Sequence, residues 1–207
     1  MTDLQTARHK TMKNISAIIL AAGESKRMGS PKMLLPFGNR TIIETVLDNV
    51  IAAGIEDVIV VLGADMRKIR TVIGRRQVRH CYNDNYKTGM LSSVKCGFAF
   101  LSAGCDAALV IPGDQPEITP QEIRKVMDAC HKSGKGLVMP VYNKKRGHPL
   151  LVADRYFEEV KNMSDEGGLR RLSVIHPDDV YEVPTGDPGV LHDIDTREDY
   201  LKAINKI

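Results

Sequence analysis

Short apolar runs alternate with amphipathic stretches along the first two-thirds of the chain. Residues 15–22, 57–62 and 107–111 are apolar runs of five to eight residues, which is typical of buried strands. Between them, residues 41–53 repeat apolar side chains at helical spacing and meet Gly54, a common helix stop. This alternation predicts an α/β protein with a mainly parallel sheet covered by helices on both faces.

The rest of the chain continues this pattern at shorter intervals. We expect a helix over 120–133, with Thr119 as its N-cap and Pro120 at its first position. The later strands lie closer together, which predicts one antiparallel pair in a mixed sheet. The other predicted elements are a basic helix from 63 to 76, a short strand at 78–81, a helix at 92–102, strands at 136–140 and 149–153, two short helical pieces, a strand near Tyr181 and a helix at 196–205. We therefore predict a single three-layer αβα domain over 15–207, after a flexible polar leader over 1–14.

Composition places the chain among ordinary globular proteins, with 43% hydrophobic and 27% charged residues in a length of 207. No apolar run approaches the roughly 18 residues of a membrane span, and the amino terminus has no apolar signal-peptide core. We therefore expect a cytoplasmic protein. Its four cysteines show no CxxC or Cys/His spacing, which favours reduced thiols over disulfides or a zinc site.

Charge is distributed unevenly along the chain. The net charge is +3, but residues 1–80 carry 13 Lys and Arg against 7 Asp and Glu, whereas residues 81–207 carry 16 against 19. The basic excess is spread over one loop and one helix and does not form a run. This pattern favours a small anionic substrate over a nucleic acid, and no membrane partner is expected.

The basic loop after the first predicted strand is the first candidate for function. Gly23 and Gly29 bound it, and it carries Lys26, Arg27 and, just beyond, Lys32. Glycine-bounded backbone and cations at a sheet edge suit a phosphate, although a solvated basic turn has the same composition. The loop lacks the GxxxxGK(S/T) of a P-loop and the GxGxxG of a dinucleotide-binding dehydrogenase.

Two acidic positions are predicted near the same edge. Asp114 follows a buried strand, and in sheets of this class ligands bind outside the carboxyl ends of the strands. Mg²⁺ is typically held by one or two carboxylates plus phosphate oxygens, although a turn aspartate is the alternative explanation. Near the end of the chain, we expect Asp193 to face this edge and Asp195 to cap the helix that starts at Thr196.

Five motifs together resemble a known family. The segment LAAGESKRMGSPKMLL matches the signature of the nucleotidyltransferases that share the sugar-nucleotide pyrophosphorylase fold. The chain also contains NYxxGMxSS at 85–93, PGDQP at 112–116, RGHP at 146–149 and DIDTxED at 193–199. With these motifs, residues 15–205 look like the molybdenum cofactor cytidylyltransferase branch, the MocA/MobA-like NTP transferases. The resemblance implies a Rossmann-like nucleotidyltransferase fold and an enzyme that uses Mg²⁺.

The resemblance also implies roles for individual residues. Arg27 and Lys32 would hold the triphosphate and stabilise charge as pyrophosphate leaves. Asp114 would bind the metal, with Asp193 as the second ligand and Asp195 as the alternative. The nucleotide would contact Ala21, Ala22, Gly23, Asn83, Gly89 and Ser93, and the acceptor would contact Arg146 and His148.

The implied reaction is transfer of CMP from CTP to the phosphate of molybdopterin or of the molybdenum cofactor, with release of pyrophosphate. Ala22 favours CTP, because the guanylyltransferase branch commonly has Ala-Gly-Gly where this chain has Ala-Ala-Gly. A pterin phosphate is the expected acceptor, and a molybdenum hydroxylase is the expected recipient of the product. Such an acceptor is ionised at neutral pH, so the reaction needs no general base.

Two alternatives remain open at this point. The chain could be a cytidylyl- or other nucleotidyltransferase that acts on a sugar phosphate or alcohol phosphate, because acceptor choice resides in loops. It could also be a non-catalytic accessory protein of a molybdenum enzyme. Lys32, Asp114 and Asp193 argue against the accessory protein, since a pure carrier needs no metal-binding pair.

Overall fold

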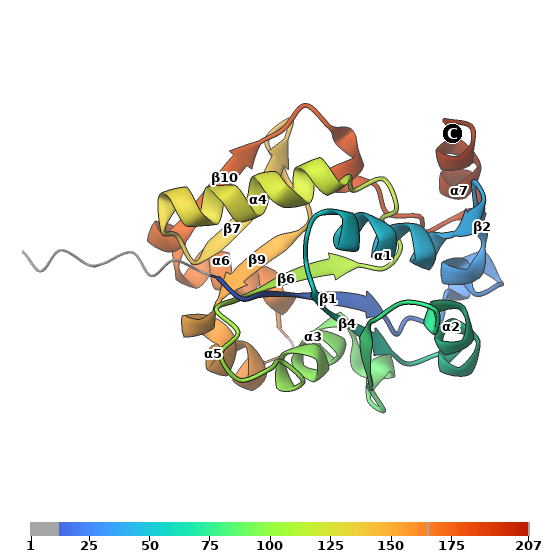
Figure 1. Cartoon of the computed structure of the whole chain (residues 1–207), viewed down its shortest axis with the longest axis horizontal. Helices are drawn as coiled ribbons and strands as arrows, with labels where there is room; N and C mark the ends of the chain where they lie inside the picture. Colours follow the sequence, from blue (N-terminus) through green and yellow to red (C-terminus); the bar gives the residue numbers. More distant parts are fainter. Residues whose placement is uncertain (1–12, 165, 207) are drawn as a thin grey trace, which may run out of the picture.

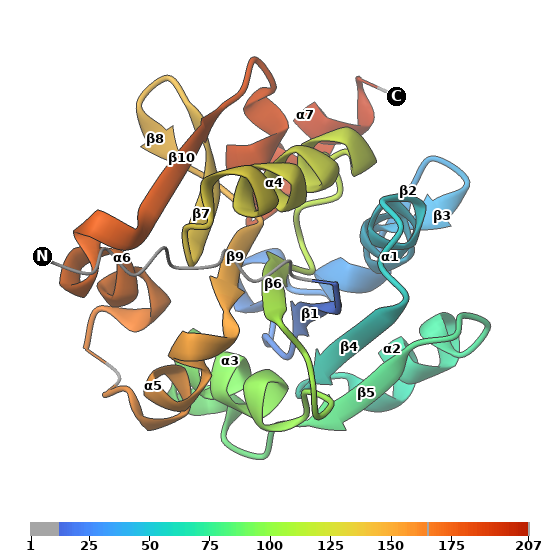
Figure 2. The ribbon, with the colours of Figure 1, turned by 60° about the vertical axis from the view of Figure 1, so that its left-hand side comes forward.

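The computed structural model describes residues 13–164 and 166–206. One eight-stranded sheet forms its centre, with strand order β10-β7-β9-β6-β1-β4-β5 and β8 paired to β7. Figure 2 shows these strands in this order, from β10 at the upper left to β5 at the lower right. The strands are β1 (Ile15–Ala21), β4 (Asp57–Leu62), β5 (Arg79–Tyr82), β6 (Ala107–Pro112), β7 (Leu137–Tyr142), β8 (Lys145–Arg146), β9 (Leu150–Ala153) and β10 (Val180–Pro184); a separate hairpin pairs β2 (Pro36–Phe37) with β3 (Arg40–Thr41).

The sheet is mainly parallel. Strand β9 runs antiparallel to both β6 and β7, and β8 runs antiparallel to β7. The pairs β1–β4, β1–β6, β4–β5 and β7–β10 are parallel. The predicted mixed sheet is confirmed, and β9 is the reversed strand within it.

Helices cover both faces of the sheet, with α1 and α4 above it and α3 and α5 below it in Figure 1. The helices are α1 (Ile42–Ala52), α2 (Met66–Ile73), α3 (Met90–Ala99), α4 (Pro120–Ser133), α5 (Phe157–Asn162), α6 (Arg171–Ile175) and α7 (Arg197–Ile204). Short 3-10 turns are η1 (Lys26–Met28), η2 (Lys32–Leu34), η3 (Tyr86–Thr88), η4 (Asp154–Tyr156), η5 (Gly168–Arg170), η6 (Pro177–Asp179) and η7 (Pro188–Leu191).

Side-chain alternation along β1 explains the two layers. Ala17, Ile19 and Ala21 pack into a core with α1, α2 and α4, whereas Ile18 and Leu20 pack into a second core with α3, α5 and α6. Successive residues of a strand point to opposite faces, so a strand that is apolar at every position from 17 to 21 needs helices on both sides. The apolar run in the sequence thus fixes β1 at the centre of the three layers.

The predicted N-cap of α4 is confirmed, and the structure shows a second N-cap at α1. Thr119 accepts the Glu122 N–H at 3.2 Å at the start of α4. Thr41 caps α1 in a reciprocal capping box with Glu44. The predicted helix at 92–102 begins two residues earlier, at Met90, because Gly89, with φ 128°, ends the preceding loop. The helix ends at Ala99, three residues before the predicted end.

The segment between the predicted strands at 136–140 and 149–153 forms a hairpin. Asn143 and Lys144 have φ values of 47° and 63°, the left-handed conformation that a two-residue hairpin turn requires. The turn pairs β8 with the end of β7, Val141 with Arg146. This hairpin determines where Arg146 points, as described below.

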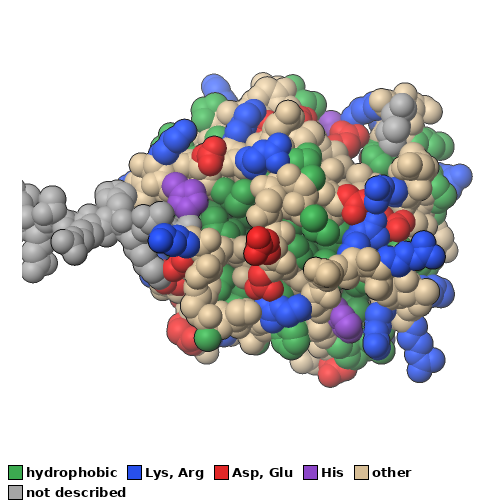
Figure 3. Space-filling view, viewed as in Figure 1, with side chains coloured by type: hydrophobic (Ala, Val, Ile, Leu, Met, Phe, Trp, Pro, Cys, Tyr) green, Lys and Arg blue, Asp and Glu red, His purple; other side chains and the backbone are tan. Residues whose placement is uncertain are grey.

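The predicted leader, residues 1–14, lies mostly outside the described residues. The backbone N–H groups of Lys13 and Asn14 donate to Asp106 Oδ2 at 2.9 and 3.0 Å. Within the described part of the chain, no helix has the length and apolar character needed to cross a membrane. Lys and Arg side chains gather on the side of the molecule that carries α2 and the β2–β3 hairpin (Figure 3), in keeping with the basic first 80 residues.

Candidate active site

The loops after β1 and β6 leave the sheet at the same edge. These strands are adjacent and parallel, with Leu20 opposite Pro112. The Gly113 N–H donates to the Leu20 carbonyl at 2.9 Å, and a Cβ on Gly113 would lie 2.9 Å from that same oxygen. Glycine at 113 therefore lets the chain pass close to β1 and places Asp114 beside the basic loop.

A backbone hydrogen bond ties the distant 193–195 segment to Asp114. The Ile194 N–H donates to the Asp114 carbonyl at 3.0 Å, and the Ile194 side chain is buried against α1 and α7. The buried Gln115 side-chain amide donates to Asp193 Oδ1. Asp193 and Asp195 are thereby held on either side of a residue that is fixed to the β6 loop.

The predicted N-cap at Asp195 is wrong. Thr196 caps α7 in a capping box, accepting the Asp199 N–H at 3.2 Å. Asp195 instead accepts from Lys32 Nζ and from Arg27, both at 2.8 Å. Side chains two residues apart share a face of an extended chain, and both Asp193 and Asp195 line the same cavity.

Lys32 is the central cation of this cluster and is only 9% exposed. Its backbone N–H donates to Ser25 Oγ at 3.2 Å, and its ammonium group forms ion pairs with Asp114 and Asp195. Burial opposes the charged form, but the charge and hydrogen bond of Asp114, together with those of Asp195, outweigh it and raise the pKa of Lys32. Lys32 is therefore a fixed positive charge at neutral pH.

At Asp114, in contrast to Lys32, burial outweighs the effect of the neighbouring opposite charge on the pKa. Its side chain is 16% exposed, and this burial raises its pKa although the charge of Lys32 lowers it; the nearby charge of Asp193 raises it further. The carboxylates of Asp114 and Asp193 repel one another, and the single positive charge of Lys32 does not balance their two negative charges. A divalent cation would relieve this repulsion.

A cavity of about 650 Å³ lies over this cluster. Ten of the predicted site residues line it, and they come from five separate segments of the chain. They are Ala22, Gly23, Arg27, Lys32, Gly89, Ser93, Asp114, His148, Asp193 and Asp195. The fold therefore brings the basic loop, the acidic segments and the start of α3 into one site.

Two residues predicted to bind the nucleotide do not line the cavity. Ala21 is fully buried in the core beneath it. Asn83 is 5% exposed and donates from Nδ2 to Ser92 Oγ and Ser93 Oγ at 2.8 and 3.0 Å. Asn83 thus stabilises the first turn of α3 through these hydrogen bonds. Of Asn83, Ser92 and Ser93, it is Ser93 that lines the cavity.

Arg146 is not brought to the cavity. In the β8 hairpin its guanidinium donates to Glu182 at 2.7 Å and to Ser173 Oγ at 2.9 Å, and the side chain is 45% exposed. Besides Arg27, the cavity is lined by Arg170, which comes soon after Gly167 and Gly168, at φ 81° and 58°. The local sequence around Arg170 carries no signal for this position, because it is the fold that brings the residue to the cavity.

His148 lies on the same wall as Arg170. Burial lowers the pKa of His148 to about 4, with Asp114 raising it and Arg170 lowering it by smaller amounts. The imidazole is therefore neutral at physiological pH. A neutral ring can donate or accept a hydrogen bond, but it adds no positive charge to the cavity.

The donor set fits a divalent cation that also binds phosphate. Among residues 13–164 and 166–206, no group of three or more His, Cys, Asp or Glu could hold a metal by itself. Asp114 and Asp193 supply two carboxylates, which is the number that Mg²⁺ usually takes from protein when phosphate oxygens and water complete its coordination. The site therefore favours a metal that arrives with a polyphosphate.

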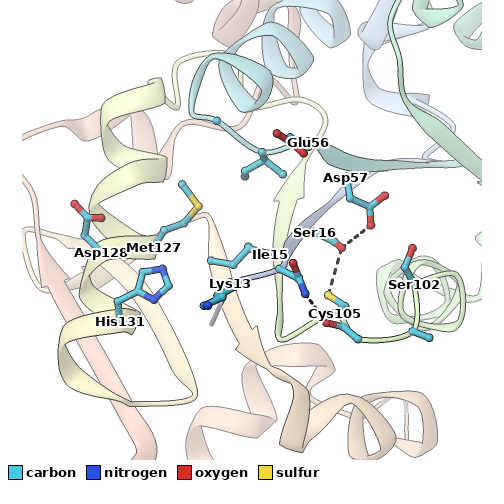
Figure 4. A pocket seen from close by; sticks show the side chains of 15 residues that line it. Lys13, Ile15, Ser16, Glu56, Asp57, Ser102, Cys105, Met127, Asp128 and His131 are labelled. Atoms are coloured by element: carbon cyan, nitrogen blue, oxygen red, sulfur yellow. Dashed lines mark hydrogen bonds between the residues drawn. The ribbon is translucent and has the colours of Figure 1, made fainter. Parts of the chain in front are cut away.

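A second cavity of similar volume lies at the opposite end of β1, where the strand begins (Figure 4). Its Ser16 hydroxyl donates to Asp57 Oδ2 at 2.6 Å, and Asp57 also binds Arg79. Glu56, Asp57 and Asp128 line it together with Lys13 and His131. It contains none of the predicted site residues, and it lies at the amino end of the strands, away from the edge where ligands bind in this class of sheet.

Comparison with known proteins finds relatives that match most of the chain. The model of the family described as "MobA-like NTP transferase domain" matches residues 17–180. The molybdenum cofactor cytidylyltransferase of Escherichia coli K12 is 28% identical over 193 residues, covering 93% of this chain and 96% of the relative. The nicotine blue oxidoreductase of Paenarthrobacter nicotinovorans is 26% identical over 199 residues, covering 92% of this chain and 96% of the relative.

Solved structures match the fold over nearly the whole chain. The crystal structure of Rv0371c from Mycobacterium tuberculosis H37Rv superposes with a TM-score of 0.83 at 26% identity, covering 94% of this chain and 100% of that one. A further structure of Rv0371c, in complex with manganese, matches with a TM-score of 0.79 at 24% identity and the same coverage.

Proposed function

The chain belongs to the MobA-like NTP transferase family and is a nucleotidyltransferase, and from this premise we propose that it transfers CMP from CTP to the phosphate of molybdopterin or of the molybdenum cofactor. The observation that carries the proposal is the Lys32 cluster. Lys32 pairs with Asp114 and Asp195 in a cavity that Asp193 and Arg27 also line. The curated relative from Escherichia coli supports the choice of acceptor and nucleotide.

The proposed reaction is an in-line displacement. An oxygen of the acceptor phosphate attacks the α-phosphorus of CTP, the bond from that phosphorus to the β-phosphate oxygen breaks, and pyrophosphate leaves. The attacking oxygen is already ionised at neutral pH, so the neutral His148 is not required to remove a proton. Catalysis then consists of positioning and charge stabilisation.

Four charged residues of the cavity have proposed roles in this reaction. Lys32 is fixed by Asp114 and Asp195, so its ammonium group meets the developing negative charge without moving from solvent. Arg27 is 70% exposed on the rim and would hold the outer phosphates. Asp114 and Asp193 would hold Mg²⁺, which supplies charge neutralisation on the triphosphate when bound.

The nucleotide would occupy the side of the cavity formed by Ala22, Gly23, Gly89 and Ser93. Gly63 keeps this wall tight, because a Cβ there would lie 2.6 Å from the Ala22 carbonyl and 2.9 Å from the Tyr86 Cβ. The acceptor would occupy the side formed by His148 and Arg170. A molybdenum hydroxylase is the proposed recipient of the product, and the cytoplasm is the proposed location.

Pyrophosphate release from a panel of nucleotides and acceptors tests the proposal. We expect Mg²⁺-dependent release with CTP and molybdopterin, and much less with GTP, ATP or UTP. Release that depends instead on a sugar phosphate or alcohol phosphate would identify the same chemistry on another acceptor. Tight pterin binding with no metal-dependent release under any combination would indicate an accessory protein and contradict the proposal.

Arg170 provides a prediction about the acceptor side. Replacing Arg170 with alanine removes a cation from the wall that carries His148, so we expect the KM for the acceptor to rise about 10-fold or more while CTP affinity stays near its original value. A charge-assisted hydrogen bond contributes about 1.5–3 kcal/mol, which corresponds to this range. Initial-rate kinetics with each substrate varied in turn would measure the effect.

The matched control is the next residue. Arg171 lies outside the cavity lining and donates to Ser164 Oγ at 3.2 Å. Arg171→Ala removes the same charge one position away, and we expect no change in the acceptor KM. Equal effects from the two substitutions would mean that net charge, and not the position of Arg170, controls acceptor binding.

A further inference from the structure

Two cysteines from different elements meet where α3 packs against β5. Cys81 lies on β5 and Cys96 on α3, and their Sγ atoms are 3.3 Å apart. Cys96 Sγ also lies 3.6 Å from the Tyr82 carbonyl oxygen, which holds its side chain against β5. The thiols are reduced in this structure, and a modest approach of the two sulfurs would reach bonding distance.

We propose that Cys81 and Cys96 are a redox modification site, at which a low-molecular-weight disulfide such as oxidised glutathione converts the two thiols into an intramolecular disulfide. This inference is independent of the proposed substrates, because it concerns the fold around α3 and not the transfer reaction.

The two thiols have different roles. Cys81 is only 8% exposed, whereas Cys96 is partly exposed and lines a surface depression of about 560 Å³ together with Lys95 and Lys161. The hydrogen bond to Cys81 lowers the pKa of Cys96, while the same contact and burial raise the pKa of Cys81. Cys96 is the more accessible of the two thiols and is therefore the attacking group, and Lys95 and Lys161 line the depression through which the anionic glutathione disulfide would approach.

The exchange takes place in two steps. The Cys96 thiolate attacks one sulfur of oxidised glutathione, which forms a mixed disulfide and releases one glutathione thiolate. Cys81 then gives up its proton and attacks Cys96 Sγ, which forms the Cys81–Cys96 bond and releases the second glutathione. The protein loses two electrons and two protons, and one glutathione disulfide becomes two thiols.

The other two cysteines are in different surroundings. Cys105 Sγ lies 3.3 Å from Ser16 Oγ and 3.1 Å from the Ala107 carbonyl oxygen, at the opposite end of the sheet. Cys130 is 1% exposed, and burial raises its pKa to about 11. Cys105 is partly exposed, as Cys96 is, but it does not contact Cys81 or Cys96. It therefore serves as the control thiol within the same protein.

Closing this bond would link the two elements that flank the nucleotide wall. The segment between them includes Asn83, which braces Ser92 and Ser93, as well as Gly89 and Ser93, which line the cavity. Oxidation therefore fastens α3 to β5 and restricts the motion of residues 83–93. Slower amide hydrogen exchange over this segment is the physical signature.

The test treats the reduced, full-length protein with oxidised glutathione, followed by alkylation of free thiols and peptide mass mapping. We expect a Cys81–Cys96 linked peptide with a mass loss of two hydrogen atoms, reversed by dithiothreitol, and slower exchange over residues 83–93. Cys96→Ser should abolish the link and leave Cys81 unmodified. Cys81→Ser should instead trap a stable glutathione adduct on Cys96, and Cys105→Ser should change neither result.

Three outcomes would overturn the proposal. In the first, the native protein accumulates a glutathione adduct on Cys96 with no internal link. In the second, Cys105 is modified before Cys96. In the third, the linked peptide forms but exchange over residues 83–93 stays unchanged, which would contradict the fastening of α3. If Cys81→Ser fails to fold, the Cys96→Ser protein and the native mapping still decide the question.

Discussion

Asp114→Asn is expected to lower nucleotidyl transfer by about 10³-fold or more at saturating substrates, with the fold retained. Asparagine has nearly the same shape as aspartate, so the Ile194 N–H still meets the residue 114 carbonyl and Lys32 still pairs with Asp195. What is lost is one of two carboxylates that would hold the metal. Metal stabilisation of transition-state charge supplies several kcal/mol, and each 1.36 kcal/mol is a factor of ten in rate.

Steady-state kinetics over a Mg²⁺ titration would measure this effect. The matched control is Asp128→Asn, which makes the same replacement at an exposed residue of α4 that lines the opposite cavity. We expect the control to keep its rate. Near-wild-type turnover of Asp114→Asn at high Mg²⁺ would show that the metal is held elsewhere.

Lys32→Met is expected to reduce transfer by about 10²–10³-fold, by analogy with the loss of one preorganised donor to a developing negative charge. Methionine keeps an unbranched side chain in the buried channel but removes the ammonium group that pairs with Asp114 and Asp195. Because Lys32 is fixed before substrate binds, the loss should appear in kcat more than in the affinity for CTP.

The same substitution should also lower thermal stability. Leaving a buried carboxylate without its partner costs about 3–5 kcal/mol when it stays charged. The pKa of Asp114 is already raised by burial and by Asp193, so it can take up a proton, and we expect a smaller loss in the free energy of unfolding. Thermal unfolding of Lys32→Met beside the native protein would measure the difference.

Lys26→Met is the matched control for Lys32. Lys26 lies six positions earlier in the same loop, its side chain is 78% exposed and pairs with Glu24 at 2.9 Å, and it does not line the cavity. We expect this variant to keep both its rate and its unfolding temperature. A comparable loss of activity in Lys26→Met would mean that the loop acts through its net charge alone.

The order of strands and helices could be predicted from the sequence because each signal is local. The apolar run that forms β1 requires cover on both faces, and Thr41, Thr119 and the glycines mark helix ends through contacts within a few residues. The position of Asp114 could also be predicted, because a residue that comes soon after a buried parallel strand lies at the carboxyl edge of the sheet.

The placements that sequence reasoning could not reach depend on contacts distant along the chain or on turn geometry. Arg146 was assigned to the acceptor, but the Asn143-Lys144 turn directs it to Glu182 and Ser173. Asp195 was expected to cap α7, but the cap is Thr196, and Asp195 pairs with a lysine 163 positions away in the sequence.

The sequence by itself determined that this protein has a central parallel sheet with a basic glycine loop and an aspartate at the ends of two of its strands. It did not determine that these strands are neighbours, or that a C-terminal segment returns to them. The tertiary structure decided both, through β1–β6 pairing and the hydrogen bond from Ile194 to Asp114. The physical reason is that burial and capping act over a few residues, whereas the charges that make the site come from segments that only the folded core brings together.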